Sequence, residues 1–258
     1  MRLMKRILSA AAVLALSASL LVGCSSGTAS SVPVSASSAA ESTVSSVEET
    51  ASSAVDENEA AAAQLLNDLT GSYQELWPVI LADEYKQTWL DDCTALVGED
   101  NAEAAFEKLS SMVTGDVYGE DAVKAYANGG GAYFCGFTNS LAILTFDGET
   151  STISGTDKDG NVLFSHTYHY IGMEPVRGLY EFQSDDADSG EFTYFFLAPD
   201  TSAETYHIEF RYGSDADALS QYDAGDYAYW LASGISTDCD QTMIDNCIKL
   251  FCTENLAG

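Results

Sequence analysis

The sequence predicts an α+β protein in which an up-and-down antiparallel β-barrel follows a helical lobe and precedes a C-terminal helix. Three observations predict this class. Apolar residues recur at helical spacing before residue 130, they alternate with polar residues between 131 and 212, and helical spacing returns after residue 238. About seven short strands in so short a stretch favour a barrel or a sandwich, because an open sheet would leave unpaired edges.

The first residues indicate export. Basic residues within positions 2–6 precede an apolar stretch from Ile7 to Leu21, which is too short and has the wrong flanks for a membrane-spanning helix. The stretch ends in Leu-Val-Gly-Cys at 21–24, which looks like a lipobox. We therefore expect residues 1–23 to be a lipoprotein signal peptide and Cys24 to carry the lipid that anchors the chain on the extracytoplasmic face of the cell membrane. The alternative is an ordinary secretion signal that happens to contain a cysteine.

Residues 24–58 have the composition of a tether. They are mostly Ser, Ala, Thr, Val and Glu, with no aromatic residue, Lys or Arg. Such a segment buries too little apolar surface to offset the entropy lost on ordering, so we expect it to be disordered. Residues 59–258 then remain for one folded domain with a sizeable core.

The charge of the chain restricts its partners. It has 40 acidic and 10 basic residues, which give a formal net charge of −30. Nucleic acids bind basic patches, so a nucleic-acid partner is excluded. An acidic surface concentrates cations, although solubility alone also accounts for such a charge.

The helical lobe is expected between residues 59 and 126. Apolar side chains at helical spacing predict a helix before Gly71 and a second, shorter one interrupted by Pro78. Two further helices are predicted at 102–112 and 121–126, and the tail from 238 to 256 is predicted to be helical again. The strands are predicted at 131–137, 141–146, 151–155, 162–171, 177–183, 191–198 and 204–212.

Five cysteines follow Cys24, and an odd number cannot all pair within one chain. They are Cys93, Cys135, Cys239, Cys247 and Cys252. None forms a cluster with the spacing of structural zinc sites. Outside the cell one or two disulfides are permitted, and buried free thiols are the simpler interpretation for most of these residues.

Several short motifs, none of them specific alone, follow one another in a characteristic order. They are the segments 68–78 (DLTGSYQELWP), 113–116 (VTGD), 167–170 (TYHY), 176–182 (VRGLYEF), 191–199 (EFTYFFLAP) and 207–213 (HIEFRYG). Their order and spacing resemble the ZinT family of bacterial zinc-binding proteins over about residues 62–255. The resemblance implies a calycin- or lipocalin-like barrel with added helices that binds zinc through histidines at the barrel mouth.

The strand 204–212 carries the predicted metal ligands. Residues two apart on a strand point to the same side, so His207 and Glu209 can share one ion. This matches the His-x-His of the family if a carboxylate replaces the second histidine. In another register His207 aligns with the second histidine and Thr205 with the first. His169 is a possible third ligand, because Leu163 and Ile171 share its parity and are expected to face the barrel interior.

Two features weaken the zinc prediction. The resemblance places a further family histidine three residues before Ala-Pro, and here that position is Phe195, which cannot ligate a metal. The remaining histidine, His166, lies three residues from His169 on one strand, so the two face opposite sides. Each histidine also has a metal-free interpretation as a hydrogen-bonded or exposed ring.

The sequence therefore predicts an extracytoplasmic, lipid-anchored protein that binds a divalent metal ion, with zinc the expected ion, and that passes it to a metal ABC importer. The alternative is a metal-free calycin-like module that binds an organic ligand or a protein partner. No motif of a hydrolase, metalloprotease or phosphate-binding enzyme occurs, so an enzyme is not expected.

Overall fold

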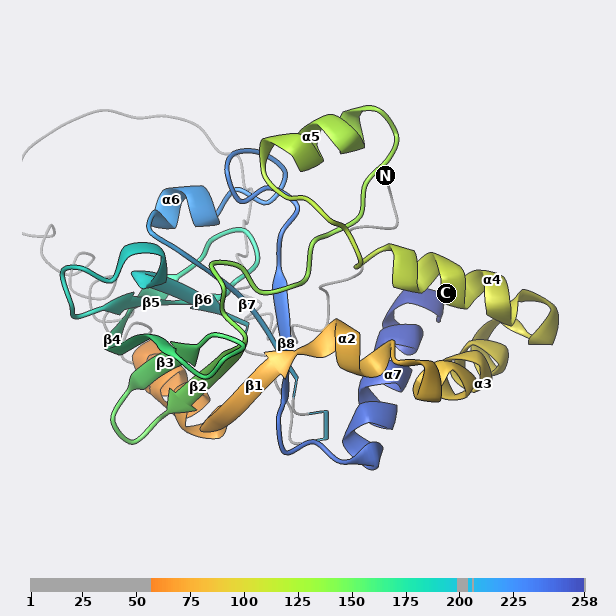
Figure 1. Ribbon diagram of the computed structural model, residues 1–258, viewed down its shortest axis with the longest axis horizontal. Coiled ribbons are helices and arrows are strands. Elements are labelled where there is room, and N and C mark those ends of the chain that lie inside the picture. The colour runs from red at the N-terminus through yellow and green to blue at the C-terminus, as the bar shows by residue number, and fades with distance from the viewer. Residues whose placement is uncertain (1–56, 199–203, 206, 258) are drawn as a thin grey trace, which may run out of the picture.

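A computed structural model describes residues 57–198, 204–205 and 207–257 (Figure 1). The predicted signal peptide at 1–23, Cys24 and nearly all of the predicted tether at 24–58 lie outside the described residues. The first described helix covers residues 57–68, so it begins two residues before the predicted start of the domain at residue 59. Among the described residues, no helix combines the length and the apolar character needed to cross a bilayer.

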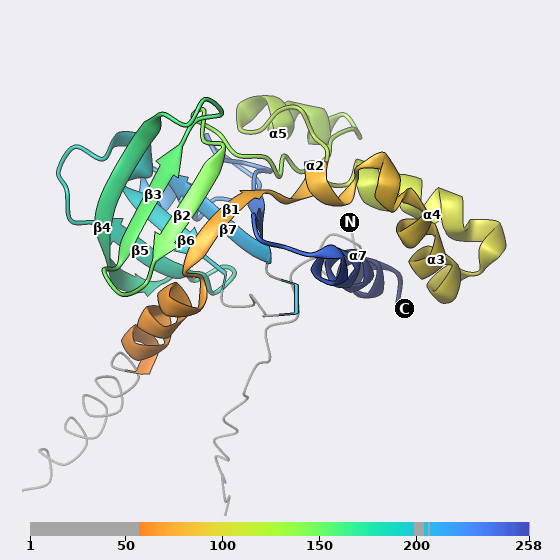
Figure 2. The ribbon, with the colours of Figure 1, turned by 60° about the horizontal axis from the view of Figure 1, so that its bottom comes forward.

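Eight antiparallel strands form a closed barrel in which each strand pairs with its neighbours in the sequence and β1 pairs with β8 (Figure 2). Closure leaves no unpaired sheet edge. The predicted α+β class with a calycin-like barrel is thus confirmed. The strands are β1 (Gly71–Glu75), β2 (Ile143–Asp147), β3 (Thr152–Thr156), β4 (Val162–Met173), β5 (Tyr180–Ser184), β6 (Tyr194–Leu197), β7 (His207–Gly213) and β8 (Ala232–Ser236).

Three strand assignments differ from the sequence prediction. Residues 71–75 were expected to be helical or in a turn but form β1, where Tyr73 lies opposite Leu144 of β2 and Ser236 of β8. Strand β8 was not predicted at all. The predicted strand at 131–137 is wrong: this segment makes only isolated bridges, from Phe134 to Thr114 and to Trp230. Its Phe137 N–H donates to the Glu75 carboxylate at 2.5 Å, so a side chain replaces a ladder partner.

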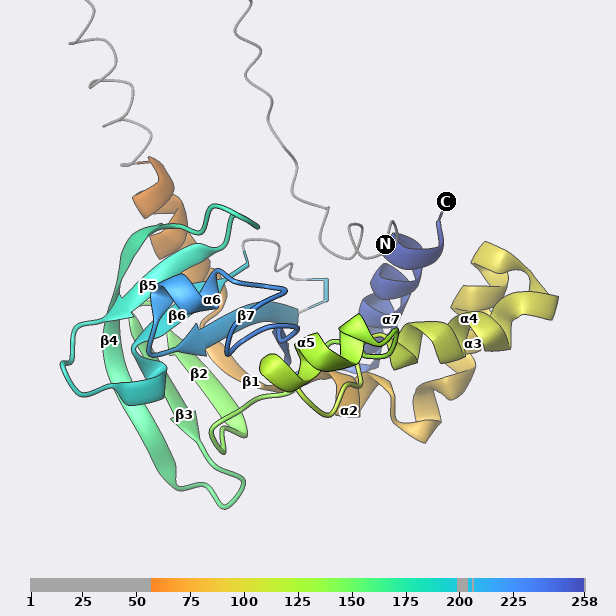
Figure 3. The same ribbon diagram turned by 90° about the horizontal axis from the view of Figure 1, so that it is seen from above.

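Helices α2 (Leu76–Ile80), α3 (Lys86–Val97), α4 (Glu99–Ser111) and the C-terminal α7 (Gln241–Leu256) form a lobe beside the barrel. Two further helices are α5 (Glu120–Ala127) and the short α6 (Ala216–Leu219), whose Leu219 belongs to the barrel core. Figure 3 shows α7 on the barrel side of α3 and α4. Two acidic side chains cap helix starts, with Asp240 accepting from Met243 N at 3.0 Å and Asp215 from Ala218 N at 3.1 Å.

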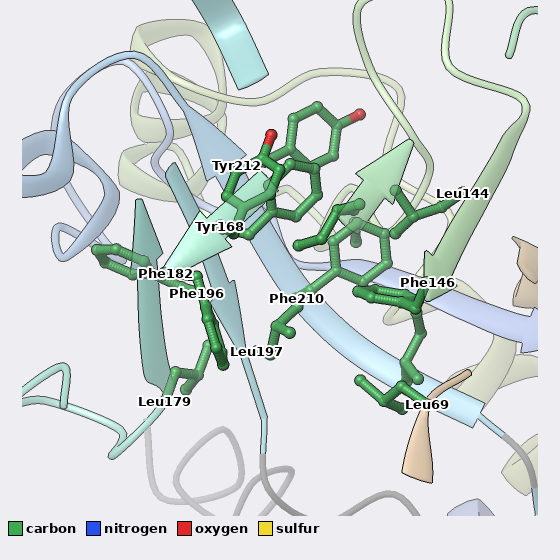
Figure 4. Packing of buried hydrophobic residues seen from close by; sticks show 14 of the residues in the cluster. Leu69, Leu144, Phe146, Tyr168, Leu179, Phe182, Phe196, Leu197, Phe210 and Tyr212 are labelled. Carbon is green, nitrogen blue, oxygen red and sulfur yellow. The ribbon is translucent and has the colours of Figure 1, made fainter. Parts of the chain in front are cut away.

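The two parts have separate hydrophobic cores. The barrel interior is filled by aromatic and aliphatic side chains, among them Phe146, Phe182, Phe210 and Tyr212, all 1% exposed or less (Figure 4). A small barrel filled in this way is a packed core and leaves little room for a ligand. The second core lies between α2, α3, α4 and α7 and is continued by Ile235 on the outer side of β8.

Candidate functional site

The side chains of β7 point alternately into the barrel and away from it. Ile208, Phe210 and Tyr212 are at most 2% exposed and belong to the barrel core. Because successive side chains of a strand alternate between its faces, His207 and Glu209 point out of the barrel wall. The expectation that these two side chains lie in the barrel opening is therefore wrong. They face the helical lobe, and both are only partly exposed.

His207 and Glu209 line one pocket between the barrel wall and the lobe. Its other walls come from α2, with Leu76, Trp77 and Ile80, and from α7, with Cys247, Leu250, Phe251 and Glu254; the cavity volume is about 30 Å³. By volume such a cavity has room for about two water molecules. The residues that line the pocket thus include one imidazole and one carboxylate from β7 and a second carboxylate from α7.

Helix α7 is fixed against the approach to β7 by two hydrogen bonds. The Asn246 side chain donates to Glu204 O at 2.9 Å, and the Cys247 thiol donates to Thr205 O at 3.1 Å. Burial raises the pKa of the Cys247 thiol to about 12, so it stays protonated at neutral pH. Cys247 therefore serves as a structural contact in this state, because a metal ligand would need to be a thiolate.

The imidazole of His207 is oriented by Thr205. The Thr205 hydroxyl oxygen lies 2.7 Å from His207 Nδ1. Histidines that bind metal ions are commonly held in this way, with one ring nitrogen bonded to the protein and the other directed at the ion. Because Nδ1 is engaged, a cation would bind His207 through Nε2.

Glu209 also borders a second cavity, on the other side of Trp77. This cavity is lined by Cys135, Ser233 and Arg177 among others. The pKa of the Cys135 thiol is raised by its burial and further by the negative charge of Glu209. The guanidinium of Arg177 stacks on the Tyr222 ring at 3.9 Å, and its Nη2 donates to the Tyr133 hydroxyl at 3.2 Å.

Arg211, the next outward-facing residue of β7, is completely buried. It donates to the backbone carbonyls of Leu219 and Tyr227 and stacks on Tyr222 at 4.4 Å. It thereby fixes the segment between α6 and β8 on the outer face of the barrel. Burial lowers the pKa of Arg211 to about 10, so it remains charged at neutral pH.

The donor set suits a divalent cation, but the side chains do not converge as they stand. Among the residues that the structure describes, no three His, Cys, Asp or Glu side chains lie close enough together to hold a metal ion. Zinc sites need three or four ligands at about 2.0–2.3 Å. His207 and Glu209, which share a side of one strand, are the pair that fits best, and Glu254 of α7 is the other carboxylate that lines the pocket.

The prediction that His169 faces the barrel interior is wrong. On β4 the interior positions are those of Phe164 and Tyr168, whereas Leu163 and Ile171 are 36% and 41% exposed. The barrel takes the aromatic residues of this strand inward and leaves its aliphatic ones in solvent. The His169 side chain is 53% exposed, and its Nδ1 lies 2.6 Å from Asp185. It is absent from the residues that line the His207 pocket.

His166 and Phe195 are on the inward side of their strands. The His166 side chain is 17% exposed, lies 2.7 Å from Asp186, and stacks on Phe164 with ring centroids 5.9 Å apart. Phe195 is fully buried in the barrel core and pairs with Tyr212 across β6 and β7. A side chain at position 195 thus faces the opposite side of the barrel wall from His207.

The sequence predicted the C-terminal helix, but not that this helix would form a wall of the pocket. Cys247, Phe251 and Glu254 are spaced i, i+4 and i+7, which places them on one face of α7. This spacing was visible in the sequence, but nothing in it indicated that the face would lie against β7.

Comparisons with known proteins find a likeness among solved structures. No family model matches the chain, and none of the curated proteins does. The zinc-bound ZinT-like domain of AdcA from Streptococcus pneumoniae is similar at a TM-score of 0.44 and 14% identity, over 70% of this chain and 87% of that one. Zinc-bound AdcA from the same organism is similar at a TM-score of 0.42 and 12% identity, over 71% of this chain and 34% of that one. At these values the likeness assigns no metal ligand to this chain.

Proposed function

We propose that this protein binds a divalent cation, zinc by preference, in the pocket between β7 and α7. The observation that carries the proposal is that His207 and Glu209, on one side of β7, share a pocket with Glu254 of α7. His207 supplies Nε2, Glu209 supplies a carboxylate oxygen, and Glu254 reaches the ion by a change of side-chain rotamer. Water completes the shell. An imidazole with carboxylates is a ligand set that zinc accepts and that manganese also accepts.

The charge around the pocket supports a cation over an anion. Two carboxylates line it, and the whole chain has a formal charge of −30. Nonpolar walls from Leu76, Ile80 and Phe251 limit access of water, which strengthens the attraction between the ion and the carboxylates. With a single imidazole we expect weaker binding than in a site with three histidines.

The cellular role follows from the N-terminal sequence. In this proposal Cys24 carries the lipid, residues 24–58 hold the domain away from the membrane, and the domain delivers its ion to a metal ABC importer on the extracytoplasmic side. The support is the order of basic, apolar and Leu-Val-Gly-Cys segments at positions 2–24.

The metal proposal is tested by titrating the detergent-extracted full-length protein with zinc in a calorimeter. His207→Ala is expected to weaken binding by about tenfold or more, since even the partners of metal ligands contribute that much. Glu209→Gln keeps the size of the side chain and removes its charge, and it should weaken binding as well. Identical isotherms for wild type and His207→Ala would refute the proposal.

His169→Ala is the matched control. His169 lies on β4, its side chain is 53% exposed, and it contacts Asp185. It does not line the pocket of His207, so its removal should leave the zinc isotherm unchanged. Equal losses in His169→Ala and His207→Ala would mean that zinc binds histidines nonspecifically. The metal-free alternative predicts no saturable zinc binding in any of these proteins.

The anchor is tested separately by cell fractionation. The wild-type chain is expected in the membrane fraction, and Cys24→Ala, which has no sulfur to acylate, is expected to leave it. Retention of the Cys24→Ala chain in an unprocessed form on the membrane would be distinguished by its higher mass. A wild-type chain found in the cytoplasm would contradict the export proposal and leave the zinc measurement unaffected.

A further inference from the structure

Two cysteines of the helical lobe lie side by side in its core. Cys93 is on α3 and Cys252 is on α7, 159 residues later, and their sulfur atoms are 3.9 Å apart. Both side chains are fully buried. The ring of Trp89, one turn before Cys93, lies edge-on to Phe251 with centroids 6.0 Å apart, so the two helices are in direct contact at this point. The two thiols therefore lie close together because α3 and α7 pack directly against each other.

We propose that Cys93 and Cys252 form a disulfide that ties α7 to α3 in the exported protein. A disulfide requires the sulfur atoms to approach to about 2.05 Å. The remaining gap of roughly 2 Å is within reach of side-chain rotation together with a small shift of the last turn of α7, because α7 ends at Leu256, just after Cys252. The proposal depends on the expected export only for its oxidising environment.

The other described cysteines have different surroundings. The Cys247 thiol donates to Thr205 O at 3.1 Å. Cys135 is buried on the barrel side of the lobe, near Glu209 and Ser233, and Cys239 is half-buried before the start of α7. The pairing of Cys93 with Cys252 thus leaves three thiols unpaired, which is compatible with the odd number of cysteines after Cys24.

The reaction is a thiol–disulfide exchange with an external disulfide, such as that of an oxidised dithiol oxidoreductase or oxidised glutathione. One cysteine thiolate attacks this disulfide, forms a mixed disulfide and releases one thiol. The second cysteine then attacks the mixed disulfide, which forms the Cys93–Cys252 bond and releases the second thiol. The two protons of the cysteines end on the two released thiols, and the external disulfide is reduced by two electrons.

The timing of this step follows from burial. Both side chains are fully buried, so an external disulfide cannot reach either sulfur atom once the lobe is packed. The exchange therefore takes place before α7 has closed onto α3, or when α7 opens transiently. Once formed, the bond would hold the wall of the pocket that carries Glu254, two residues beyond Cys252.

The test is peptide mapping of the full-length protein extracted from the membrane of an exporting host. The protein is denatured without reductant, alkylated, digested and analysed by mass spectrometry. A second sample is first reduced, then opened in moderate urea and exposed to oxidised glutathione, so that it needs no export. We expect a peptide pair joining Cys93 to Cys252, with a mass lower by about 2 Da than the sum of the thiol peptides. Cys135 and Cys247 are expected to be alkylated.

A Cys247→Ala protein is the matched control, because it removes another buried thiol of α7 and should retain the linked pair. Cys252→Ala should leave Cys93 fully alkylated. Complete alkylation of both cysteines after glutathione treatment, or linkage of either one to Cys135, Cys239 or Cys247, would overturn the proposal. If the linked pair appears in the glutathione sample but not in the sample from the exporting host, the pairing is supported. The export proposal is then the one that is contradicted.

Discussion

Position 195 provides a sharp test of the geometry of the barrel wall. The sequence resemblance would place a metal-binding histidine there, which suggests that Phe195→His should restore a stronger zinc site. The structure predicts the opposite. Phe195 is fully buried in the barrel core, and its ring centroid lies 5.3 Å from that of Tyr212 and 5.4 Å from that of Tyr168. A histidine at this position would lie inside the barrel, on the far side of the wall from His207.

The expected cost of Phe195→His has two parts. Replacing the phenyl ring with a smaller polar ring loses roughly 2 kcal/mol of apolar burial. An imidazole N–H buried among aromatic rings without an acceptor costs about 1–3 kcal/mol more. The free energy of unfolding should therefore fall by about 3–5 kcal/mol. For a domain of about 200 residues, each kcal/mol corresponds to about 2–4 °C in Tm, so a decrease of about 10 °C is expected.

The assay is urea and thermal unfolding followed by circular dichroism, together with a zinc titration. Phe195→Leu is the control, because it keeps the site apolar and should cost less than the histidine. The zinc affinity of Phe195→His should equal that of wild type. A protein that gains zinc affinity with little loss of stability would show that side chain 195 faces His207, and the described alternation along β6 and β7 would then be wrong.

Three further predictions concern the site and the fold. Zinc binding should weaken as the pH falls, because His207 must be neutral to bind the ion; a titration at several pH values that shows no such loss in wild type would exclude an imidazole ligand. Gly148→Ala should destabilise the domain by about 1–3 kcal/mol, because an added Cβ would lie 2.4 Å from Asn67 Cα, and thermal unfolding measures this. Burial raises the pKa of the Cys247 thiol from its ordinary value to about 12, so between these values the folded state retains a proton that the unfolded state releases. Its contribution to stability is thus fully present below about pH 9 and is lost as the pH rises toward 12, which urea unfolding across this range should show in wild type and less in Cys247→Ala.

Local patterns in the sequence determined most of the elements. Period-two alternation located β2, β3 and β4 to within a few residues, and helical spacing located α4, α5 and α7, because side-chain periodicity reports directly which face of an element is buried. The pairing of His207 with Glu209 on one side of a strand also followed from the sequence, since it depends only on residue spacing.

Which side of the wall these residues face was decided by tertiary structure alone. Strand parity shows that His207 and Glu209 point together, but not that the barrel core takes Ile208, Phe210 and Tyr212 and leaves the pair to the helical lobe. The same ambiguity led to the wrong orientation of His169, because aliphatic residues on its side of β4 are exposed while aromatic ones fill the barrel.

The closure of the barrel by β1 and β8 could not be predicted from local sequence patterns either. Tyr73 continues the helical spacing of its neighbours, yet it pairs with β2 and β8, because closing the barrel satisfies backbone hydrogen bonds that a free sheet edge would leave unmet. The pocket itself exists only because α7, about 30 residues after β7, returns to cover its outer face. The sequence by itself predicted that His207 and Glu209 share one side of a strand, because this depends only on residue spacing. Only the packing of barrel against lobe decided that Glu254 of α7 lines the same pocket and that His169 does not.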